Sequence, residues 1–396
     1  MSDWIERDSK YLFQNYGRQP IVLERGEGSR VWDSEGNEYL DFVGGLAVTS
    51  LGHSHPAVTA AASAQAEQLI HVSNLYYTTP MIELAELLVE NSPLDRVFFC
   101  NSGAEAIEAA IKVARRWGHD EQGGKHGIIA MQDGFHGRSL GALAATGTAR
   151  YREPFEPLPT GFSHVPWNDL DALREATDDN TVAVLMEPIQ GEGGVNAPAP
   201  GYLQGVRDWC DENGLLLILD EIQSGIGRTG TLWAHEQDGI EPDIMCVAKG
   251  LAGGLPIGAV LAREELAGHL VPGDHGTTFG ANPVATAAGV AVLRHIFEND
   301  VLAAARRASD RLVARLSAME DRLPAVTEVR GRGLLLAVSL SSEAAAGVVT
   351  LCRERGLLVN NVRPDRIRLM PALIVGDDEI DRACDILEEA IQLATS

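Results

Sequence analysis

Residues 244–256 read IMCVAKGLAGGLP: an apolar run, a single lysine at position 249, and then a glycine-rich stretch. The apolar run has the length of a buried strand, and it ends abruptly at a charged side chain. Taking an ammonium group out of water costs several kcal/mol unless a neighbouring group compensates. Such a lysine usually extends its amino end to solvent, but in a cleft its pKa can fall and it can act as a nucleophile.

Four other short apolar runs in the middle of the chain end in the same way. They are RVFFC (96–100) before Asn101, GIIAM (127–131) before Gln132, AVLM (183–186) before Glu187 and LLLIL (215–219) before Asp220. Apolar strands that alternate with helical patterns predict an α/β fold with a mostly parallel sheet, covered on both faces. Ligands of such sheets bind beyond the carboxyl ends of the strands. The polar residues that end these runs are therefore expected in one crevice.

The two ends of the chain have different patterns. Residues 21–43 contain short strand patterns with turn signals, and after about residue 290 helical stretches give way to GLLLAVSL, LLVN and RIRLMP, followed by a last helix. We predict an N-terminal segment (1–47) that packs with the small domain, a large domain (48–290) and a smaller C-terminal α+β domain (291–396).

Composition excludes several classes of partner. The chain has 32 basic and 56 acidic residues, a net charge of -24, which argues against nucleic acid or an anionic membrane as a partner. The stretch 244–262 nearly has the length of a membrane span, but its lysine, proline and glycines disfavour that interpretation.

Five widely spaced cysteines without a CxxC pair predict reduced core thiols, and no metal site is expected. Since the N-terminus shows no secretory signal, we expect a cytoplasmic location.

The stretch CNSGAEAIEAAIKVARRW (100–117) has the signature of a capped helix. Ser102 and Glu105 have capping-box spacing, and a well-capped helix is the simpler interpretation. The alternative interpretation is functional: the start of this helix also binds an anion. Because Gly103 has no side chain to block approach, the free backbone amides and the Ser102 hydroxyl can hold a phosphate at the helix N-terminus.

Asp220 ends a strand, where an aspartate can cap the following turn. It can also pair with a protonated pyridine nitrogen, as in enzymes that use pyridoxal 5'-phosphate (PLP), with Gln223 near the ring hydroxyl. The glycines at 225, 227 and 230 match G-x-G-x-x-G, so an NAD-dependent dehydrogenase is an alternative. That fingerprint needs a direct turn from strand into helix and an acidic end to the next strand, which here ends in Lys249.

The loop DGFHGRSLGALAATG (133–147) contains Phe135, His136 and Arg138. An aromatic residue followed by histidine is usually part of the packing. Next to a bound planar ring, however, Phe135 can stack and Arg138 can hold a carboxylate bidentately. Lys249 can form a Schiff base with an aldehyde cofactor. Phosphate site, carboxylate, aromatic ring and lysine, in this order and at strand ends, together favour PLP.

The chain resembles the class III (subgroup II) PLP-dependent aminotransferases of fold type I, and among them the acetylornithine aminotransferases. The similarity covers nearly the whole chain. It includes NSGAEAIEAAIKVAR (101–115), FHGRSLGALAATG (135–147), LDEIQSGIGRTG (219–230), AKGLAGGLPIGA (248–259), GTTFGANP (276–283) and IRLMPALIV (367–375).

The resemblance implies a role for each matching cofactor residue. Lys249 attaches to the cofactor, Asp220 pairs with the pyridine nitrogen and Gln223 lies near the ring oxygen. The phosphate is bound by Ser102, Gly103 and Ala104, the ring by Phe135, and Thr278 comes from the partner subunit of a homodimer.

The resemblance also implies substrate contacts. Arg138 matches the arginine for the distal carboxylate, Arg368 the arginine for the α-carboxylate of glutamate, and Glu192 the switch that covers Arg368 when an ω-amine binds. The implied reaction moves the δ-amino group of N2-acetyl-L-ornithine to 2-oxoglutarate. Tyr16 resembles a carboxylate-binding tyrosine of ornithine δ-aminotransferases, although Leu46 stands where those enzymes usually have a tyrosine. Free ornithine and succinylornithine remain alternatives, as does a PLP-fold protein without turnover.

Overall fold

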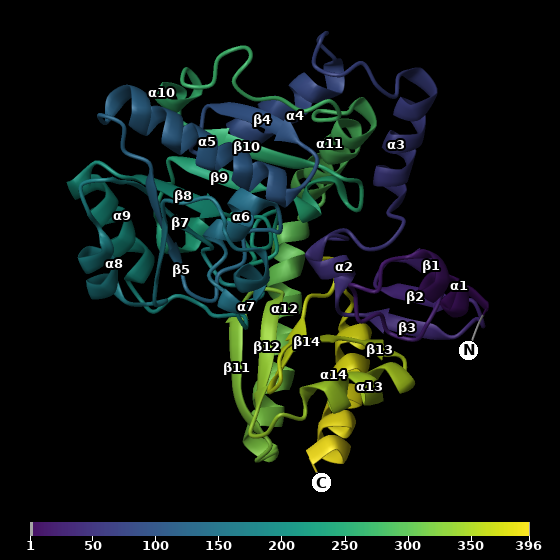
Figure 1. Cartoon of the computed structure of the whole chain (residues 1–396). Helices are drawn as coiled ribbons and strands as arrows, with labels where there is room; N and C mark the ends of the chain where they lie inside the picture. Colours follow the sequence, from purple (N-terminus) through teal and green to yellow (C-terminus); the bar gives the residue numbers. More distant parts are fainter. Residues whose placement is uncertain (1–2, 396) are drawn as a thin grey trace.

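The computed structural model describes residues 3–395, which form three β-sheets with helices around them (Figure 1). Residues 1, 2 and 396, at the ends of the predicted N-terminal segment and C-terminal domain, lie outside the described residues. The largest sheet has seven strands, in the order β4 (Arg96–Cys100), β10 (Gly258–Ala262), β9 (Ile244–Val247), β8 (Leu216–Asp220), β7 (Thr181–Met186), β5 (Gly127–Met131) and β6 (Phe162–Val165).

The large sheet is mostly parallel, as the alternation of strands and helices predicted. Strands β6, β5, β7, β8 and β9 run parallel to one another, whereas β10 is antiparallel to both β9 and β4. The strand patterns found in the sequence did not include β6 or β10. β10 follows the glycine-rich stretch directly, so the chain reverses there without the crossover helix that marks a parallel strand.

Helices cover both faces of this sheet. On one face, α5 (Gly103–Glu121) packs Ile107 and Ala110 against residues such as Ile218. On the other, α8 (Leu170–Ala176) and α9 (Tyr202–Asn213) pack against the alternate residues of β8, Leu217 and Leu219. Strand residues are therefore apolar on both faces, which explains the continuous apolar runs in the sequence. Other helices are α3 (Pro56–Gln68), α4 (Thr79–Glu90), α6 (Leu140–Ala145), α7 (Ala149–Arg152) and α10 (Glu264–Ala267).

The N-terminal strands lie beside the C-terminal part of the chain. After helix α1 (Asp3–Tyr11), strands β1 (Leu23–Glu27), β2 (Arg30–Asp33) and β3 (Glu38–Asp41) form a sheet that β13 (Leu357–Leu358) joins by parallel pairing with β3. Helix α2 (Gly44–Ala47) ends at the predicted boundary after residue 47, whereas residue 290 lies inside α11 (Pro283–Glu298). The domain boundaries stay a prediction.

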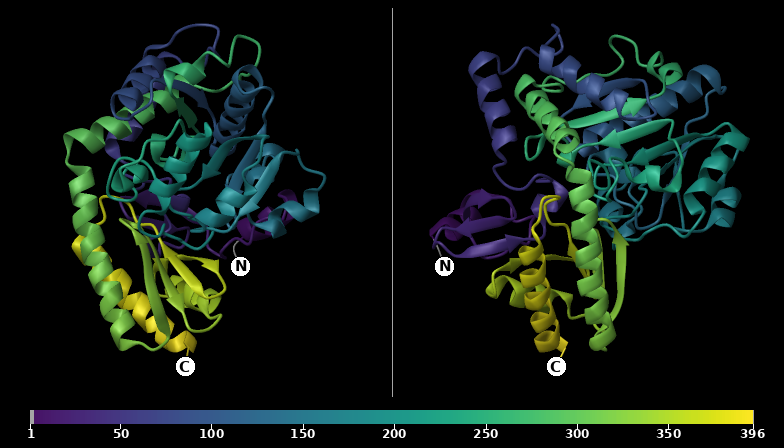
Figure 2. Two further views of the ribbon diagram at one scale, coloured as in Figure 1. Left: turned by 90° about the vertical axis from the view of Figure 1, so that its left-hand side faces the viewer. Right: turned by 180° about the vertical axis from the view of Figure 1, so that it is seen from behind.

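The C-terminal part is an antiparallel sheet covered by helices. Its strand order is β11 (Val326–Arg332), β12 (Leu335–Leu340), β15 (Arg366–Leu369) and β14 (Asn360–Arg363). The long helix α12 (Val301–Arg322) runs from the large sheet along this part (Figure 2), where it contacts β11 and α14 (Asp377–Thr395). Helix α13 (Ala345–Glu354) packs against α14. Strand β15 thereby places Arg368 opposite the edge of the large sheet.

All five cysteines lie buried as free thiols, as predicted. No helix between residues 3 and 395 combines the length and the apolar composition that crossing a membrane requires.

Candidate active site

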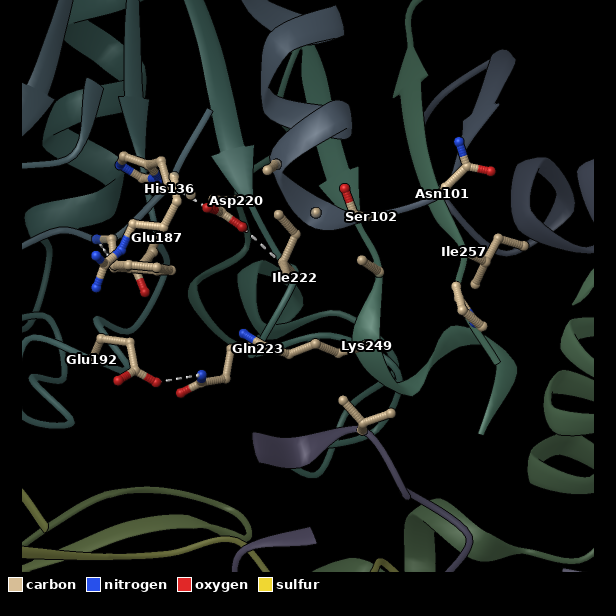
Figure 3. Close-up of a pocket in the computed structure, with 18 of the residues that line it drawn as sticks. Asn101, Ser102, His136, Glu187, Glu192, Asp220, Ile222, Gln223, Lys249 and Ile257 are labelled. Carbon is tan, nitrogen blue, oxygen red and sulfur yellow. Dashed lines mark hydrogen bonds and ion pairs between the residues drawn. The ribbon is translucent and has the colours of Figure 1, made fainter. Parts of the chain in front are cut away.

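A cavity of about 480 Å³ lies at the carboxyl ends of β8 and β9 (Figure 3). It brings together most of the residues predicted to form one crevice. Those that line it are Ser102, Gly103, Ala104, Phe135, Arg138, Glu192, Asp220, Gln223 and Lys249. The strand ends therefore converge as the sheet topology predicted.

Lys249 follows the last residues of β9 and begins a short 3-10 turn (Lys249–Ala252). Its backbone has φ 42°, a left-handed conformation that costs energy for a residue with a Cβ and that is concentrated at functional sites. Burial lowers the pKa of Lys249, and the carboxylates of Glu192 and Asp220 oppose that shift. A lysine with a lowered pKa is more often uncharged and is then a nucleophile.

Asp220 is buried at the end of β8 and is held from two sides. Its Oδ2 lies 2.8 Å from Nδ1 of His136, and its Oδ1 accepts a hydrogen bond from the Ile222 amide at 3.1 Å. Burial of His136 opposes its charged form, but the hydrogen bond to Asp220 together with the negative charges of Asp220 and Glu187 outweighs burial and raises the pKa of His136. The sequence interpretation assigned His136 to packing and missed this contact.

Glu187, another strand-end residue, connects two loops of the site. Its Oε2 accepts from the Phe135 amide at 3.1 Å and its Oε1 from the Gly191 amide at 3.0 Å. Burial raises the pKa of Glu187 to about 7. The sequence placed Glu187 at a strand end but gave it no function, because its partners are backbone amides, one of them in a loop 52 residues away. Glu187 therefore holds both Phe135 and the loop that carries Glu192.

The N-terminus of α5 forms one end of the cavity. Ser102 is the N-cap, and its Oγ accepts from the Glu105 amide at 3.3 Å. The predicted reciprocal bond shifts by one residue, since the Glu105 carboxylate accepts from the Asn101 amide at 2.9 Å. A Cβ at Gly103 would lie 2.9 Å from the Ile222 side chain, so glycine permits the close approach of the turn after Asp220. The first amides of a helix lack partners within it and can bind an anion.

Arg368 is fully buried on β15 and meets the large sheet at this cavity. Its Nη1 lies 2.6 Å from Glu192 Oε1 and 3.0 Å from Gln223 Oε1. Its Nη2 is buried without a hydrogen-bond partner in the described structure. Burial works against the ionised form of Glu192, but the charge and hydrogen bond of Arg368, together with Lys249 and Gln223, outweigh burial and lower the pKa of Glu192. The predicted pair of Glu192 and Arg368 is thus present as a direct contact.

Arg138 lies at the exposed side of the cavity, among aromatic rings. Its guanidinium carbon is 5.5 Å from the centre of the Phe135 ring and 4.0 Å from that of Tyr151. These rings orient the guanidinium by cation–π contact and leave its N–H groups for a ligand.

Three other residues singled out in the sequence do not line this cavity. Tyr16 is 68 % exposed, with Arg18 against its ring, and Leu46 is also exposed. Thr278 lies in a loop that Asn74 and Asn101 hold through Thr277. Within one chain the structure therefore gives Tyr16 no contact with the site. The partner-subunit role of Thr278 stays a prediction.

The glycine-rich loop after β8 does not form a dinucleotide site. Turns follow Asp220, and the next regular element is the 3-10 turn Ala234–Asp238. The loop thus lacks the helix N-terminus that binds a pyrophosphate. Between residues 3 and 395, no three His, Cys, Asp or Glu side chains gather as metal ligands.

The cavity contains an amine, a buried carboxylate and the N-terminus of a helix, where an anion can bind. This combination is suited to an enzyme that binds an aldehyde cofactor with a phosphate group. Residues 11–391 match the family described as aminotransferase class-III. The chain belongs to this family. The match confirms the predicted aminotransferase class and excludes the NAD-dependent dehydrogenase.

Known relatives agree with this assignment. An acetylornithine aminotransferase of Caldanaerobacter subterraneus is 50 % identical over 388 residues, covering 98 % of both chains. That of Methanopyrus kandleri is 50 % identical over 393 residues, covering 98 % of this chain and 99 % of the relative.

Solved structures confirm the predicted fold type I class. An ornithine aminotransferase of Toxoplasma gondii superimposes with a TM-score of 0.96 at 37 % identity, covering 99 % of this chain and 95 % of that one. A second structure of that enzyme is described as having partial occupancy of PLP at its active site. An N-acetylornithine aminotransferase of Stenotrophomonas maltophilia has a TM-score of 0.85 at 38 % identity, covering 98 % of each chain.

Proposed function

We propose that this enzyme transfers the δ-amino group of N2-acetyl-L-ornithine to 2-oxoglutarate, with PLP as cofactor. The products are N-acetylglutamate 5-semialdehyde and glutamate, a step of arginine biosynthesis. The observation that carries the proposal is the buried Arg368–Glu192 pair in the same cavity as Lys249. Such a pair can expose a carboxylate-binding arginine for one substrate and neutralise it for the other. The names of the relatives at 50 % identity support acetylornithine as the donor.

The residues of the cavity fit PLP by charge and by shape. The helix N-terminus at Ser102 suits a phosphate, the buried carboxylate of Asp220 suits a protonated pyridine nitrogen, and the Phe135 ring suits a planar face. The amine of Lys249 would attach to the aldehyde carbon. When bound, PLP supplies the electron sink that amino-group transfer requires.

Lys249 and Asp220 divide the proton chemistry. Once the substrate amine has taken the place of Lys249 at the aldehyde carbon, the freed Nζ of Lys249 would remove the proton from the substrate carbon that carries the amine and would deliver it to the carbon of the cofactor that Lys249 has left. The lowered pKa of Lys249 suits this role, because an uncharged amine can accept a proton. Asp220, which His136 orients, would place a negative charge beside the protonated pyridine nitrogen.

Arg138, Arg368 and Glu192 select the two substrates. Arg138 would bind the distal carboxylate of acetylornithine, whose reacting carbon carries no carboxylate of its own. Glu192 then stays on Arg368, at 2.6 Å, and neutralises it. When glutamate binds, its α-carboxylate takes Arg368, and Glu192 must rotate away.

We also propose a homodimer in the cytoplasm that shares its active sites. Exposed apolar side chains gather beside the loop of Thr278: Tyr77 is 90 % exposed, Leu75 80 % and Phe279 61 %. Asn74 joins the two segments by donating to the carbonyls of Thr277 and Gly280. Apolar side chains exposed in this way favour a protein interface, and Thr278 of one subunit would then reach the phosphate site of the other.

The deciding experiment compares kcat/KM for acetylornithine, succinylornithine, free ornithine and 4-aminobutyrate with 2-oxoglutarate as acceptor. We expect acetylornithine to be preferred over free ornithine. A clear preference for free ornithine would overturn the proposed substrate, and absence of turnover with every donor would favour a PLP-fold protein without catalysis.

Borohydride reduction after addition of PLP, followed by peptide mapping, tests the cofactor separately, since the label must fall on Lys249.

A further inference from the structure

The loop that carries Glu192 is a tight turn closed by its own backbone. Gln190 and Asn196 exchange two backbone hydrogen bonds, at 3.1 and 2.9 Å, and three of the five residues between them are glycines. Glycine leaves the backbone free to adopt many conformations, so this turn needs bonds to the rest of the molecule if Glu192 is to stay in one place. We call residues 190–196 the switch loop.

Two arginines of the C-terminal sheet bond to the backbone of the switch loop. Arg363, at the end of β14, donates from Nε to the Gly193 carbonyl at 2.9 Å. Arg366, at the start of β15, donates from Nη1 to the Gly194 carbonyl at 3.2 Å. The two arginines are partners in the antiparallel pairing of β14 with β15. The switch loop is therefore attached to the same sheet that carries Arg368.

The side chain of Arg366 makes its hydrogen bonds to the switch loop. Besides the Gly194 carbonyl, its Nη1 reaches Oδ1 of Asn196, at 3.5 Å. Between residues 3 and 395 Arg366 forms no ion pair, whereas Arg363 is paired with Asp133 at 2.9 Å. Gly194 has φ 122°, and a Cβ at this position would collide with Nη1 of Arg366. Glycine at position 194 therefore permits the guanidinium to reach the loop backbone.

Strand β15 contacts both the backbone of the switch loop and the side chain of Glu192. Arg366 and Arg368 are two residues apart on this strand, so their side chains leave it on the same face. Arg368 lies 2.6 Å from the Glu192 carboxylate, and Arg366 bonds to the carbonyl two residues further along the loop. The position of Glu192 relative to Arg368 is thus set by one short strand.

We propose that Arg366 is a positioning residue, which holds the backbone of the switch loop so that Glu192 meets Arg368 when an ω-amine binds. This inference rests on the proposed function. Without the bond from Arg366, the glycine-rich loop would spread Glu192 over more positions, and Glu192 would neutralise Arg368 for less of the time. The ω-amine half-reaction would slow, whereas a substrate carboxylate would reach Arg368 more easily. These opposite effects distinguish positioning from a general loss of structure.

Arg366→Gln tests the proposal in single-turnover measurements on the PLP-loaded enzyme. We expect the half-reaction with acetylornithine to slow about tenfold, the lower end of the effect of a hydrogen bond from a charged donor, and that with glutamate to slow less than about twofold. Arg366→Lys keeps a charged donor and should slow the acetylornithine half-reaction less than about threefold. Arg307→Gln, at an exposed arginine of α12, is the matched control and should change neither. Equal losses in both half-reactions, or no loss with acetylornithine, would overturn the proposal.

A double-mutant cycle tests whether Arg366 acts through Glu192. In the proposal Arg366 has no effect of its own on the substrate, so its replacement should matter only while Glu192 is present. In the Glu192→Ala enzyme we therefore expect Arg366→Gln to change the acetylornithine half-reaction by less than about twofold. A further tenfold loss in that enzyme would show that Arg366 acts independently of Glu192, and the proposal would be wrong.

Binding of glutarate separates this inference from the proposed function. Glutarate has two carboxylates and no amine, so calorimetry on the PLP-loaded enzyme gives its Kd without turnover. Because a carboxylate must displace Glu192 to reach Arg368, we expect Arg366→Gln to lower this Kd by about threefold. An unchanged or raised Kd would overturn the role of Arg366. If the Kd falls but the native enzyme does not turn over acetylornithine, the proposed reaction fails and the positioning role stands. If the native enzyme turns over acetylornithine but Arg366→Gln affects both half-reactions equally, the positioning role fails alone.

Discussion

Replacing Glu192 by alanine is expected to separate the two half-reactions of this enzyme. Glu192 is the only acid paired with Arg368 among residues 3–395, at 2.6 Å, and the Arg368 side chain is fully buried. In the proposed reaction, the carboxylate of bound glutamate would take the place of Glu192. With an ω-amine bound, the alanine variant leaves the guanidinium enclosed beside a substrate that carries no carboxylate near it. The loss should therefore fall on the ω-amine half-reaction.

The contacts of Arg368 set the size of this loss. Leaving one charge of a buried pair without its partner costs about 3–5 kcal/mol. Gln223 Oε1, at 3.0 Å, and Asn360 Oδ1, at 3.4 Å, remain as acceptors, and the Glu192 side chain is itself 30 % exposed. We therefore expect the lower end of that range, about 3 kcal/mol, which corresponds to a loss of roughly 150-fold in the ω-amine half-reaction. The half-reaction with glutamate should slow by less than about fivefold.

Single-turnover measurements that follow the cofactor absorbance give each half-reaction separately. Acetylornithine drives one half and glutamate the other. Glu192→Gln is the matched control, because it keeps an acceptor for Arg368 but removes the charge, and its loss should lie between those of the native enzyme and the alanine variant. Equal losses in both half-reactions, or a larger loss with glutamate, would refute the switch.

Three further changes test other parts of the site. Lys249→Ala should lower turnover by about 10²–10⁴-fold and abolish borohydride labelling of the chain by PLP, whereas labelling that persists would exclude Lys249 as the attachment point. The pKa of Glu187 is raised from 4.5 to about 7, so the native state holds its proton longer than the unfolded state as pH rises. The raised pKa of His136 acts in the same direction, so the free energy of unfolding should fall between about pH 5 and pH 8. Glu187→Gln should flatten that fall in urea titrations, and an unchanged profile would contradict the assignment. Arg228 is buried and donates to the carbonyls of Leu334 and Pro371. Arg228→Met should therefore lower the free energy of unfolding by about 1–3 kcal/mol, because both carbonyls lose their donor, and a variant as stable as the native protein would count against these contacts.

Strand ends were the part of the site that the sequence predicted best. Asp220, Glu187 and Lys249 follow continuous apolar runs, and the carboxyl ends of parallel strands meet at one edge of a sheet whatever the loops do. The sequence could not predict the bond between His136 and Asp220, which are 84 residues apart. A histidine after an aromatic residue has the same local pattern whether it packs or positions a carboxylate.

Arg368 shows a different limit of the sequence. Its strand, Arg366–Leu369, has no local feature that relates it to Lys249, and only the resemblance to known enzymes assigned it a function. Its position depends on how the antiparallel sheet meets the large sheet, which is a property of the whole chain. The shifted capping box is a smaller case, since Asn101 offers the Glu105 carboxylate both its amide and its side chain. Spacing alone does not distinguish these donors.

The strand that carries Arg368 is held to the rest of the molecule by its backbone, and this determines how the switch must work. Met370 donates to the Phe42 carbonyl at 2.7 Å, and the carbonyl of Pro371 accepts from the buried guanidinium of Arg228 at 2.5 Å. A Cβ at Gly333, beside the start of β12, would lie 2.3 Å from the backbone of Thr229, so these segments cannot move closer. The guanidinium cannot withdraw with its strand without breaking these buried contacts. We therefore expect the Glu192 side chain, which is partly exposed, to be the part that moves, so that the proposed substrate selection depends on a side-chain rotation rather than on a domain movement.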